Sequence, residues 1–297
     1  MFGSKNRGGP DGEAAVKNEK ENTGADKAQM EESRALQETL GKINNKLVVL
    51  SGKGGVGKST VAVNLAVSLS KRGYRVGLLD VDVHGPSVPK MLGIDEEKPY
   101  GDKDGKLIPV EYNGSLKVIS IGFMMDNKSD AVIWRGPLKY NVIKQFIKDV
   151  LWGDLDYLVI DCPPGTGDEP LSVVQLITEP KGAVVVTTPQ DVAVLDVMKS
   201  ITFCEKLEIP VIGVVENMSG LVCPHCGEKI DVFKTGGGEK MAEEMNVPFL
   251  GSVPLETDIV QKGDAGKPFT EDGPGSESAA AKAFDVIIEK IIQQGVN

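Results

Sequence analysis

A glycine-rich run near the start of the chain has the residue types and spacing of a phosphate-binding loop. Gly52, Gly57, Lys58 and Ser59 satisfy the pattern G-x-x-x-x-G-K-S/T. In such a loop, glycines let backbone N–H groups turn toward phosphate oxygens, while the lysine reaches the terminal phosphates and the hydroxyl coordinates Mg²⁺. The run therefore predicts a binding site for ATP and Mg²⁺, made of Gly52, Lys53, Gly54, Gly55, Val56, Gly57, Lys58, Ser59 and Thr60.

Aspartates close two of the apolar runs that we expect to form strands. Residues 157–161 end in Asp161, and residues 78–82 end in Asp80 and Asp82. Parallel strands bring their carboxyl ends to one edge of a sheet, where the ligands of open α/β folds bind. Asp161 has the form of a Walker B aspartate, and we expect it to hold Mg²⁺ directly or through water.

Two cysteines, Cys223 and Cys226, form a Cys-Pro-His-Cys-Gly knuckle whose glycine permits both sulfurs to face one metal. Zinc and iron–sulfur clusters each take about four ligands, so the pair supplies half of a site. Cys162 and Cys204 fall at a strand end and in a predicted helix, where core positions are expected, and His84 is interpreted as a polar loop residue. A homodimer would complete a four-thiolate site on its symmetry axis. The chemistry of the knuckle alone leaves zinc, an iron–sulfur cluster and a redox disulfide open.

Short apolar runs alternate with amphipathic stretches from residue 47 onward, a pattern typical of βαβ units that build a parallel sheet. Expected strands cover residues 47–50, 76–80, 157–161, 183–187, 211–215 and 249–253, and residues 99–123 form a β-rich excursion. Expected helices cover residues 58–71, 138–151, 169–178, 194–207 and 239–245, and an apolar stripe from Ala283 to Ile291 adds a C-terminal helix. The predicted fold class is α/β: a mostly parallel sheet with helices on both faces.

The beginning of the chain differs in composition from the rest. Residues 1–44 have few large apolar side chains, so we predict a disordered tail with a transient helix over residues 30–40. Residues 45–297 are predicted to form one ATPase domain that carries the knuckle near residues 223–226.

The overall charge excludes some classes of partner. The formal net charge is −10, which argues against a broad basic face for nucleic acid. No apolar stretch approaches the roughly 20 residues that span a bilayer, and the N-terminus lacks the apolar segment of a secretory signal. We therefore expect no nucleic acid or membrane partner and a cytoplasmic location.

Lys53, directly after the first glycine, makes the loop resemble the deviant Walker A motif of the ATPase class that contains MinD, ParA, the arsenite-pump ATPase and the nitrogenase iron protein. The resemblance implies an ATP-dependent homodimer in which Lys53 stabilises transition-state charge at the partner's nucleotide. It also implies that Asp82 orients the attacking water, that Asp80 supports Mg²⁺ or the loop, and that Asn217 reads the adenine edge. Residues 162–168 resemble the switch II segment of this class.

Further motifs in combination resemble the Mrp/ApbC (NBP-type) family of iron–sulfur cluster carrier ATPases. They are residues 80–87, Trp134-Arg135-Gly136-Pro137, Asn217-Met218-Ser219 and the cysteine knuckle. The resemblance covers the chain from residue 45 onward. It implies that Cys223 and Cys226 of two subunits bridge a labile [4Fe-4S] cluster, which the homodimer transfers to apo iron–sulfur proteins with slow ATP hydrolysis. No four-cysteine motif precedes the domain, so a second cluster is not expected there.

Three alternatives remain open at this point. A positioning or partitioning ATPase of the MinD/ParA type would attach to DNA or membrane and predicts a basic patch or a basic amphipathic terminus. A zinc-bridged ATPase would use the same two cysteines. A reductase like the nitrogenase iron protein would need cluster cysteines near the switch segments, where only Cys162 occurs.

Overall fold

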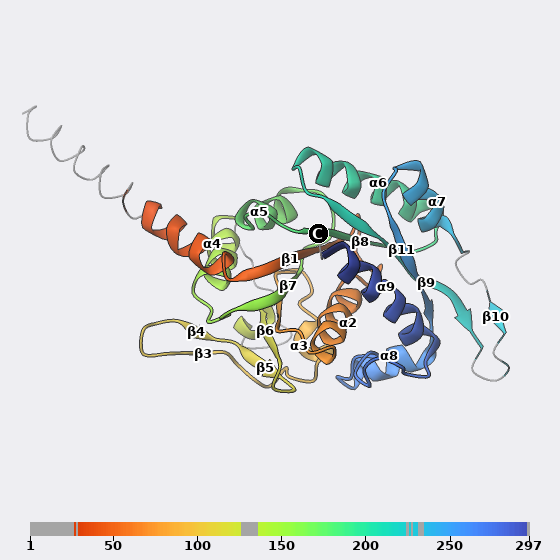
Figure 1. Cartoon of the computed structure of the whole chain (residues 1–297), viewed down its shortest axis with the longest axis horizontal. Coiled ribbons are helices and arrows are strands. Elements are labelled where there is room, and N and C mark those ends of the chain that lie inside the picture. Colours follow the sequence, from red (N-terminus) through yellow and green to blue (C-terminus); the bar gives the residue numbers. More distant parts are fainter. Residues whose placement is uncertain are drawn as a thin grey trace, which may run out of the picture.

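The computed structural model describes residues 27, 29–125, 136–223, 226, 228–230 and 235–295. Within these ranges the chain forms an α/β fold around a nine-stranded sheet in the order β10-β9-β8-β1-β7-β2-β6-β5, with β11 also paired to β9 (Figure 1). Neighbouring strands from β9 to β6 run parallel, as does β11 beside β9, whereas β10 and β5 are antiparallel to their partners. The predicted fold class is confirmed. The strands of this sheet are β1 (Ile43–Leu50), β2 (Val76–Asp80), β5 (Val110–Tyr112), β6 (Leu116–Ser120), β7 (Leu155–Asp161), β8 (Gly182–Thr187), β9 (Val211–Val222), β10 (Lys229–Ile230) and β11 (Phe249–Leu255).

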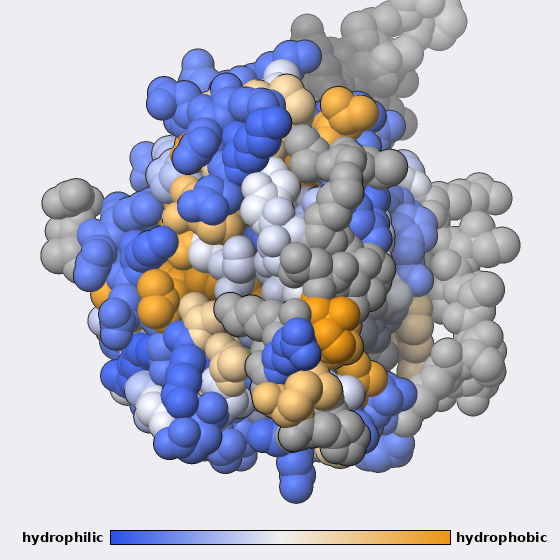
Figure 2. Space-filling model, turned by 90° about the vertical axis from the view of Figure 1, so that its right-hand side faces the viewer, coloured by the Kyte–Doolittle hydropathy of each residue, from blue (hydrophilic) through white to orange (hydrophobic). Residues whose placement is uncertain are grey.

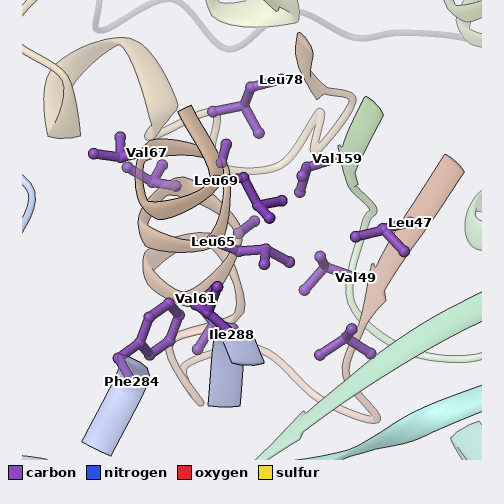
Figure 3. Packing of buried hydrophobic residues seen from close by; sticks show 14 of the residues in the cluster. Leu47, Val49, Val61, Leu65, Val67, Leu69, Leu78, Val159, Phe284 and Ile288 are labelled. Atoms are coloured by element: carbon purple, nitrogen blue, oxygen red, sulfur yellow. The ribbon is translucent and has the colours of Figure 1, made fainter. Parts of the chain in front are cut away.

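Helices cover both faces of the sheet. On one face, Val61 and Leu65 of α2 pack against strand residues and against Phe284 and Ile288 of α9 (Figure 3). On the other face, α4 to α7 pack over two further hydrophobic clusters. The helices are α2 (Lys58–Lys71), α3 (Val88–Met91), the 3-10 helix η1 (Ile121–Met124), α4 (Gly136–Lys148), α5 (Asp168–Leu176), α6 (Asp191–Lys206), α7 (Gly237–Glu244), α8 (Thr257–Asp264) and α9 (Ala279–Gly295).

The central strands are apolar along their length because the sheet is covered on both sides. In β1, Leu47 and Val49 join the cluster under α2, while Val48 and Leu50 join the opposite one. This alternation follows from the period of two residues along a strand, and burying each such side chain contributes about 1.5–3 kcal/mol. The loop that follows β1 is thus attached to a buried central strand of the sheet.

The beginning of the domain lies earlier than predicted. Residues 29–40 form a helix whose Leu36 and Leu40 are buried in the cluster with α4. Glu32 forms ion pairs with Lys144 at 2.5 Å and with Lys148 at 3.5 Å. The prediction of a disordered tail is therefore wrong for residues 29–44. Two apolar residues four positions apart are enough to hold a short helix in place when they pack against α4. Residues 1–26 lie outside the described part.

The excursion at residues 99–123 is extended, as predicted. It forms a two-stranded ribbon of β3 (Tyr100–Gly101) and β4 (Leu107–Ile108), then β5, and then β6, which joins the main sheet beside β2. Helices α3 and α8 were not predicted. None of the helices in the described ranges is both long and apolar enough to span a membrane.

Candidate functional site

The phosphate loop joins β1 to α2 near the middle of the sheet (Figure 1). Gly55 (φ 79°) and Gly57 (φ 82°) adopt left-handed backbone conformations, which glycine tolerates because it has no Cβ atom. A Cβ atom on Gly57 would also lie 2.1 Å from Asn217 Nδ2. No described side chain caps the N-terminus of α2, so its first backbone N–H groups are available to an anion.

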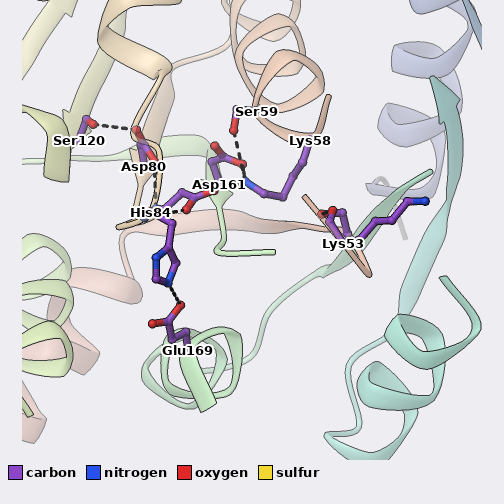
Figure 4. A network of polar contacts seen from close by, with 10 residues as sticks. Lys53, Lys58, Ser59, Asp80, His84, Ser120, Asp161 and Glu169 are labelled. Atoms are coloured by element: carbon purple, nitrogen blue, oxygen red, sulfur yellow. Dashed lines mark hydrogen bonds and ion pairs between the residues drawn. The ribbon is translucent and has the colours of Figure 1, made fainter. Parts of the chain in front are cut away.

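Lys58, the first residue of α2, lies among buried acids (Figure 4). Its Nζ forms an ion pair with Asp161 and lies 3.4 Å from Asp82 Oδ2. Burial acts to lower the pKa of Lys58, but the nearby carboxylates, Asp161 first among them, raise it above its usual value. Lys58 therefore keeps its charge in the buried site, as the phosphate-binding role requires.

Asp80 and Asp161 occupy paired positions on the neighbouring strands β2 and β7, and both are fully buried. Burial and then the charge of Asp161 raise the pKa of Asp80 to about 8. Asp80 accepts hydrogen bonds from Ser120 Oγ at 2.7 Å and from the backbone N–H of Asp82 at 3.1 Å. Burial also raises the pKa of Asp161. Three carboxylates thus surround one lysine, an arrangement that favours a further positive charge.

One carboxylate oxygen of this group has no hydrogen-bond partner. Asp161 Oδ2 is buried, and nothing in the described part of the chain donates to it. Ser59 Oγ lies 3.3 Å from Lys58 Nζ, on the side of Asp161 (Figure 4). Mg²⁺ is usually held by one or two carboxylates together with waters and substrate phosphates. Ser59 and Asp161 fit that pattern, because they offer one hydroxyl and one carboxylate beside the phosphate loop. The described residues contain no group of three or more His, Cys, Asp or Glu that could hold an ion without such help from waters and phosphates.

Lys53 is separate from this group. It is half-buried in the phosphate loop, and its backbone carbonyl accepts a hydrogen bond from Ser51 Oγ at 2.9 Å. Figure 4 shows its side chain extending away from Lys58 and Asp161. The structure therefore does not bring the Lys53 amine to the carboxylates around Lys58.

Two cavities adjoin the phosphate loop. One, of about 230 Å³, lies over the loop and is lined by the loop glycines, Lys58, Ser59 and Asp82. The other, of about 400 Å³, is lined mostly by apolar residues such as Met218, Pro254 and Phe269. The two share wall residues: Thr60, Ser87 and Met91. A polar chamber beside an apolar one has the character needed for phosphates and a base, respectively.

Asn217 lies in the middle of β9 and lines the apolar cavity. It is buried, and its Nδ2 donates a hydrogen bond to the Val56 carbonyl at 3.0 Å. The side chain predicted to read adenine is thus already attached to the phosphate loop. Glu216, the preceding residue, is fully buried and was not identified from the sequence.

A polar contact that sequence reasoning missed joins the segment after β2 to the helix that follows the predicted switch II segment. His84 Nε2 lies 2.8 Å from Glu169 Oε2, and the other oxygen of Glu169 pairs with Lys139 of α4 (Figure 4). His84 was interpreted as a polar loop residue because its partner is distant in the sequence. The contact ties the segment after Asp82 to the first turn of α5.

The two knuckle cysteines lie on a hairpin at the far edge of the sheet. Cys223 follows β9 and is half-buried, and Cys226 is exposed. The Cys223 backbone N–H donates to the Glu228 carbonyl at 2.9 Å, which starts the antiparallel pairing with β10. No third possible metal ligand joins the pair among the described residues; His225 lies outside them, as do Trp134 and Arg135 of the motif before α4.

The hairpin and its surroundings face outward. β10 and α8 both lie on the right-hand side of Figure 1, and Figure 2 shows apolar patches among hydrophilic side chains on that side. Ile230 on β10 and Val260 on α8 are exposed large apolar residues. By contrast, Cys162 and Cys204 are buried in the core, and burial raises the pKa of both thiols, that of Cys204 to about 12. The prediction that they are core residues is confirmed.

Comparison with known sequences reveals relatives over most of the chain. The sequence profile of the family described as "ParA: NUBPL iron-transfer P-loop NTPase" matches residues 42–292. An "Iron-sulfur cluster carrier protein" of Methanocaldococcus jannaschii is 47% identical over 259 residues, 87% of this chain and 88% of the relative. A "Cytosolic Fe-S cluster assembly factor NUBP2 homolog" of Nematostella vectensis is 50% identical over 257 residues, 85% and 94% of the two chains.

Solved structures show the same fold. A nucleotide-binding protein of Archaeoglobus fulgidus, in complex with ADP, is similar with a TM-score of 0.70 and 40% identity, over 79% of this chain and 91% of that one. The cell division ATPase MinD of Pyrococcus furiosus is similar with a TM-score of 0.60 and 26% identity, over 84% and 99%.

Proposed function

Because the chain belongs to the family of NUBPL iron-transfer P-loop NTPases, we propose that it binds and hydrolyses ATP and carries a [4Fe-4S] cluster, bridged between two subunits, to apo iron–sulfur proteins. The observation that carries the proposal is the presence of two incomplete sites in one chain. Within the described residues, the acids around Lys58 leave one buried oxygen without a hydrogen-bond partner, and Cys223 and Cys226 belong to no group of three or more His, Cys, Asp or Glu that could hold a metal ion.

The acids and the loop define the nucleotide half of the proposal. Backbone N–H groups of residues 52–60 and the Lys58 amine bind the phosphates, and Ser59 and Asp161 hold Mg²⁺, with Asp80 behind them. Bound Mg²⁺ would neutralise charge on the phosphate oxygens. The A. fulgidus relative, 40% identical, is described as an ADP complex, which supports an adenine nucleotide at this loop.

Hydrolysis needs a group that orients water and a group that stabilises the charge that develops on the transferred phosphoryl group. Asp82 lies beside Lys58 at the open side of the loop and is proposed to orient the water. Lys53, which points away from its own acids (Figure 4), is proposed to act on the nucleotide of the partner subunit. The adenine is proposed to occupy the apolar cavity, against Asn217.

The hairpin defines the cargo half. Two thiolates fill half of a four-ligand site, and a second copy of the chain supplies the other half on a two-fold axis. A site shared by two chains and reached from solvent opens more readily than a closed cage, which suits delivery. Relatives named as an iron–sulfur cluster carrier and as a cytosolic assembly factor support this cargo and a cytosolic place of action.

Anaerobic reconstitution of the full chain with iron and sulfide tests the proposal. The expected product is a brown dimer with about one four-iron cluster per two chains, lost in Cys223→Ala/Cys226→Ala and retained in the control Cys204→Ala, whose thiol lies in the core. Zinc in place of iron, or an unchanged cluster in the double variant, would contradict the cluster assignment. A metal-free protein that bound vesicles or DNA only with ATP would instead support a positioning ATPase.

A further inference from the structure

One buried carboxylate, that of Glu216, lies in β9, the strand that leads into the cysteine hairpin. Glu216 lies in β9 between β8 and β11, opposite Thr187 and Ser252, and has no exposed surface. A buried carboxylate is costly unless its oxygens accept hydrogen bonds. The groups that donate hydrogen bonds to Glu216 therefore show which parts of the chain it holds together.

The donors come from both sides of the stretch that carries the cysteines. Before it, Ser219 Oγ donates to Glu216 Oε1 at 2.6 Å. After it, the backbone N–H groups of Gly236 and Gly238 donate at 3.1 and 2.6 Å. Ser252 Oγ on the neighbouring strand adds a fourth contact at 3.3 Å. The Glu216 carboxylate thus connects the later part of β9, before the cysteines, with the start of α7, after them.

The return point is built for this contact. Gly236 is the N-cap of α7 and has φ 80°, a left-handed conformation that favours glycine. A Cβ atom on Gly238 would lie 3.1 Å from Glu216 Oε2, tighter than ordinary packing. The positive end of the helix dipole faces the carboxylate. The start of α7 is therefore held by Glu216 rather than by a cap of its own.

The next residue along the strand reaches the phosphate loop. Asn217 donates to the Val56 carbonyl at 3.0 Å, and successive side chains of a strand point to opposite faces. One dipeptide of β9 accordingly holds the phosphate loop on the α2 face and the hairpin base on the α7 face. The Asn217–Val56 hydrogen bond therefore links the phosphate loop directly to the residue next to Glu216.

We propose that Glu216 is a positioning residue that transmits the nucleotide state of the phosphate loop to Cys223 and Cys226. The inference rests on the proposed function, since it takes the loop as the nucleotide site and the cysteine pair as the cargo site. It adds the physical connection between them, which consists of the contacts of Asn217 with Val56 and of Glu216 with Ser219, Gly236 and Gly238.

The test measures the rate at which a thiol reagent alkylates Cys226 and Cys223 in the cluster-free full chain, with and without Mg-ATP. Cys162 and Cys204 are buried and remain silent. In the wild type, ATP should change the rate by about fivefold or more, the lower end of usual coupling between two sites. In Glu216→Gln the ratio should fall toward one while binding of a fluorescent ADP analogue is unchanged. The matched control, Glu244→Gln at the exposed end of α7, should keep the wild-type ratio.

Several outcomes separate this inference from the proposed function. An unchanged ratio in Glu216→Gln, or no effect of ATP on the wild type, overturns the inference, whereas a chain that takes up no cluster but keeps the ATP-dependent ratio overturns only the cargo. If Glu216→Gln does not fold, Ser219→Ala removes one donor, and it should lower the ratio partway. At Mg-ATP concentrations that saturate each variant, combining Ser219→Ala with Asn217→Ala should give no further loss beyond Asn217→Ala, because one connection is cut twice; additive losses would contradict the connection.

Discussion

Replacing Lys58 by methionine should destabilise the nucleotide-free protein by about 3–5 kcal/mol, the usual cost of removing one partner from a buried ion pair. Methionine keeps the unbranched apolar stem, so packing changes little. The Lys58 and Asp161 side chains are 5% and 1% exposed, so water cannot replace the lost cation. Asp82 at 3.4 Å is left uncompensated as well, which places the expected loss at the upper end of that range.

Urea unfolding followed by circular dichroism measures this loss. Adding Asp161→Asn to Lys58→Met removes the stranded charge and should restore about 2 kcal/mol, within the range of coupling between contacting residues. The control Lys71→Met breaks a partly exposed pair with Glu271 and should change stability by about 0–1 kcal/mol. Equal losses in Lys58→Met and Lys71→Met would refute the account of the buried acids.

Three other substitutions probe separate parts of the structure. Lys53→Ala should retain nucleotide binding and lose hydrolysis, whereas Lys58→Ala should lose binding; equal loss of binding in both would exclude a role for Lys53 in trans. Gly57→Ala should abolish ADP binding, measured by calorimetry, because φ is 82° and the Cβ atom would meet Asn217. Gly101→Ala on β3, where the Cβ atom would lie 4.0 Å from the Lys106 carbonyl oxygen, should bind ADP normally. Glu32→Gln, but not Glu31→Gln, should speed hydrogen exchange over residues 36–40, by less than about tenfold for a partly exposed pair. The hydrogen bond from Lys144 lowers the pKa of Glu32 in the folded protein. The ion pair therefore stabilises the fold fully above the pKa that Glu32 has in the unfolded chain, and this stabilisation is lost as the pH falls through the pKa in the folded protein. An exchange rate that does not change in Glu32→Gln would contradict this.

The position of the phosphate loop and of the acids beside it could be predicted because these elements are local in the sequence. Nine consecutive residues form the loop, and Asp161 directly closes an apolar strand, so the fold needed only to bring two strand ends together. The parallel pairing of Asp80 with Asp161 does so. The acids therefore lie at the strand ends, as the sequence predicted, and next to Lys58.

The contacts that were missed depend on pairs far apart in the chain. Glu216 receives two of its hydrogen bonds from Gly236 and Gly238, about twenty positions later. His84 contacts Glu169, which lies on another element. The helix over residues 29–40 is a similar case, because a short helix with two apolar residues is stable only against a partner surface. Sequence pattern identifies the residues that start an element, whereas these contacts exist only after the elements are packed.

The position of β1 in the sheet affects the order in which the strands can pair as the chain is synthesised. β1 is bordered by β7 and β8, pairing Ile43 with Leu155 and Leu47 with Gly182. Pairings between such distant segments form slowly, since a long stretch of chain must first be closed into a loop. During synthesis, β1 and the phosphate loop must wait for both later strands. The thiols of Cys223 and Cys226 leave the ribosome only after these strands, so a nascent chain can complete the strands around its nucleotide loop before it can offer a ligand to iron.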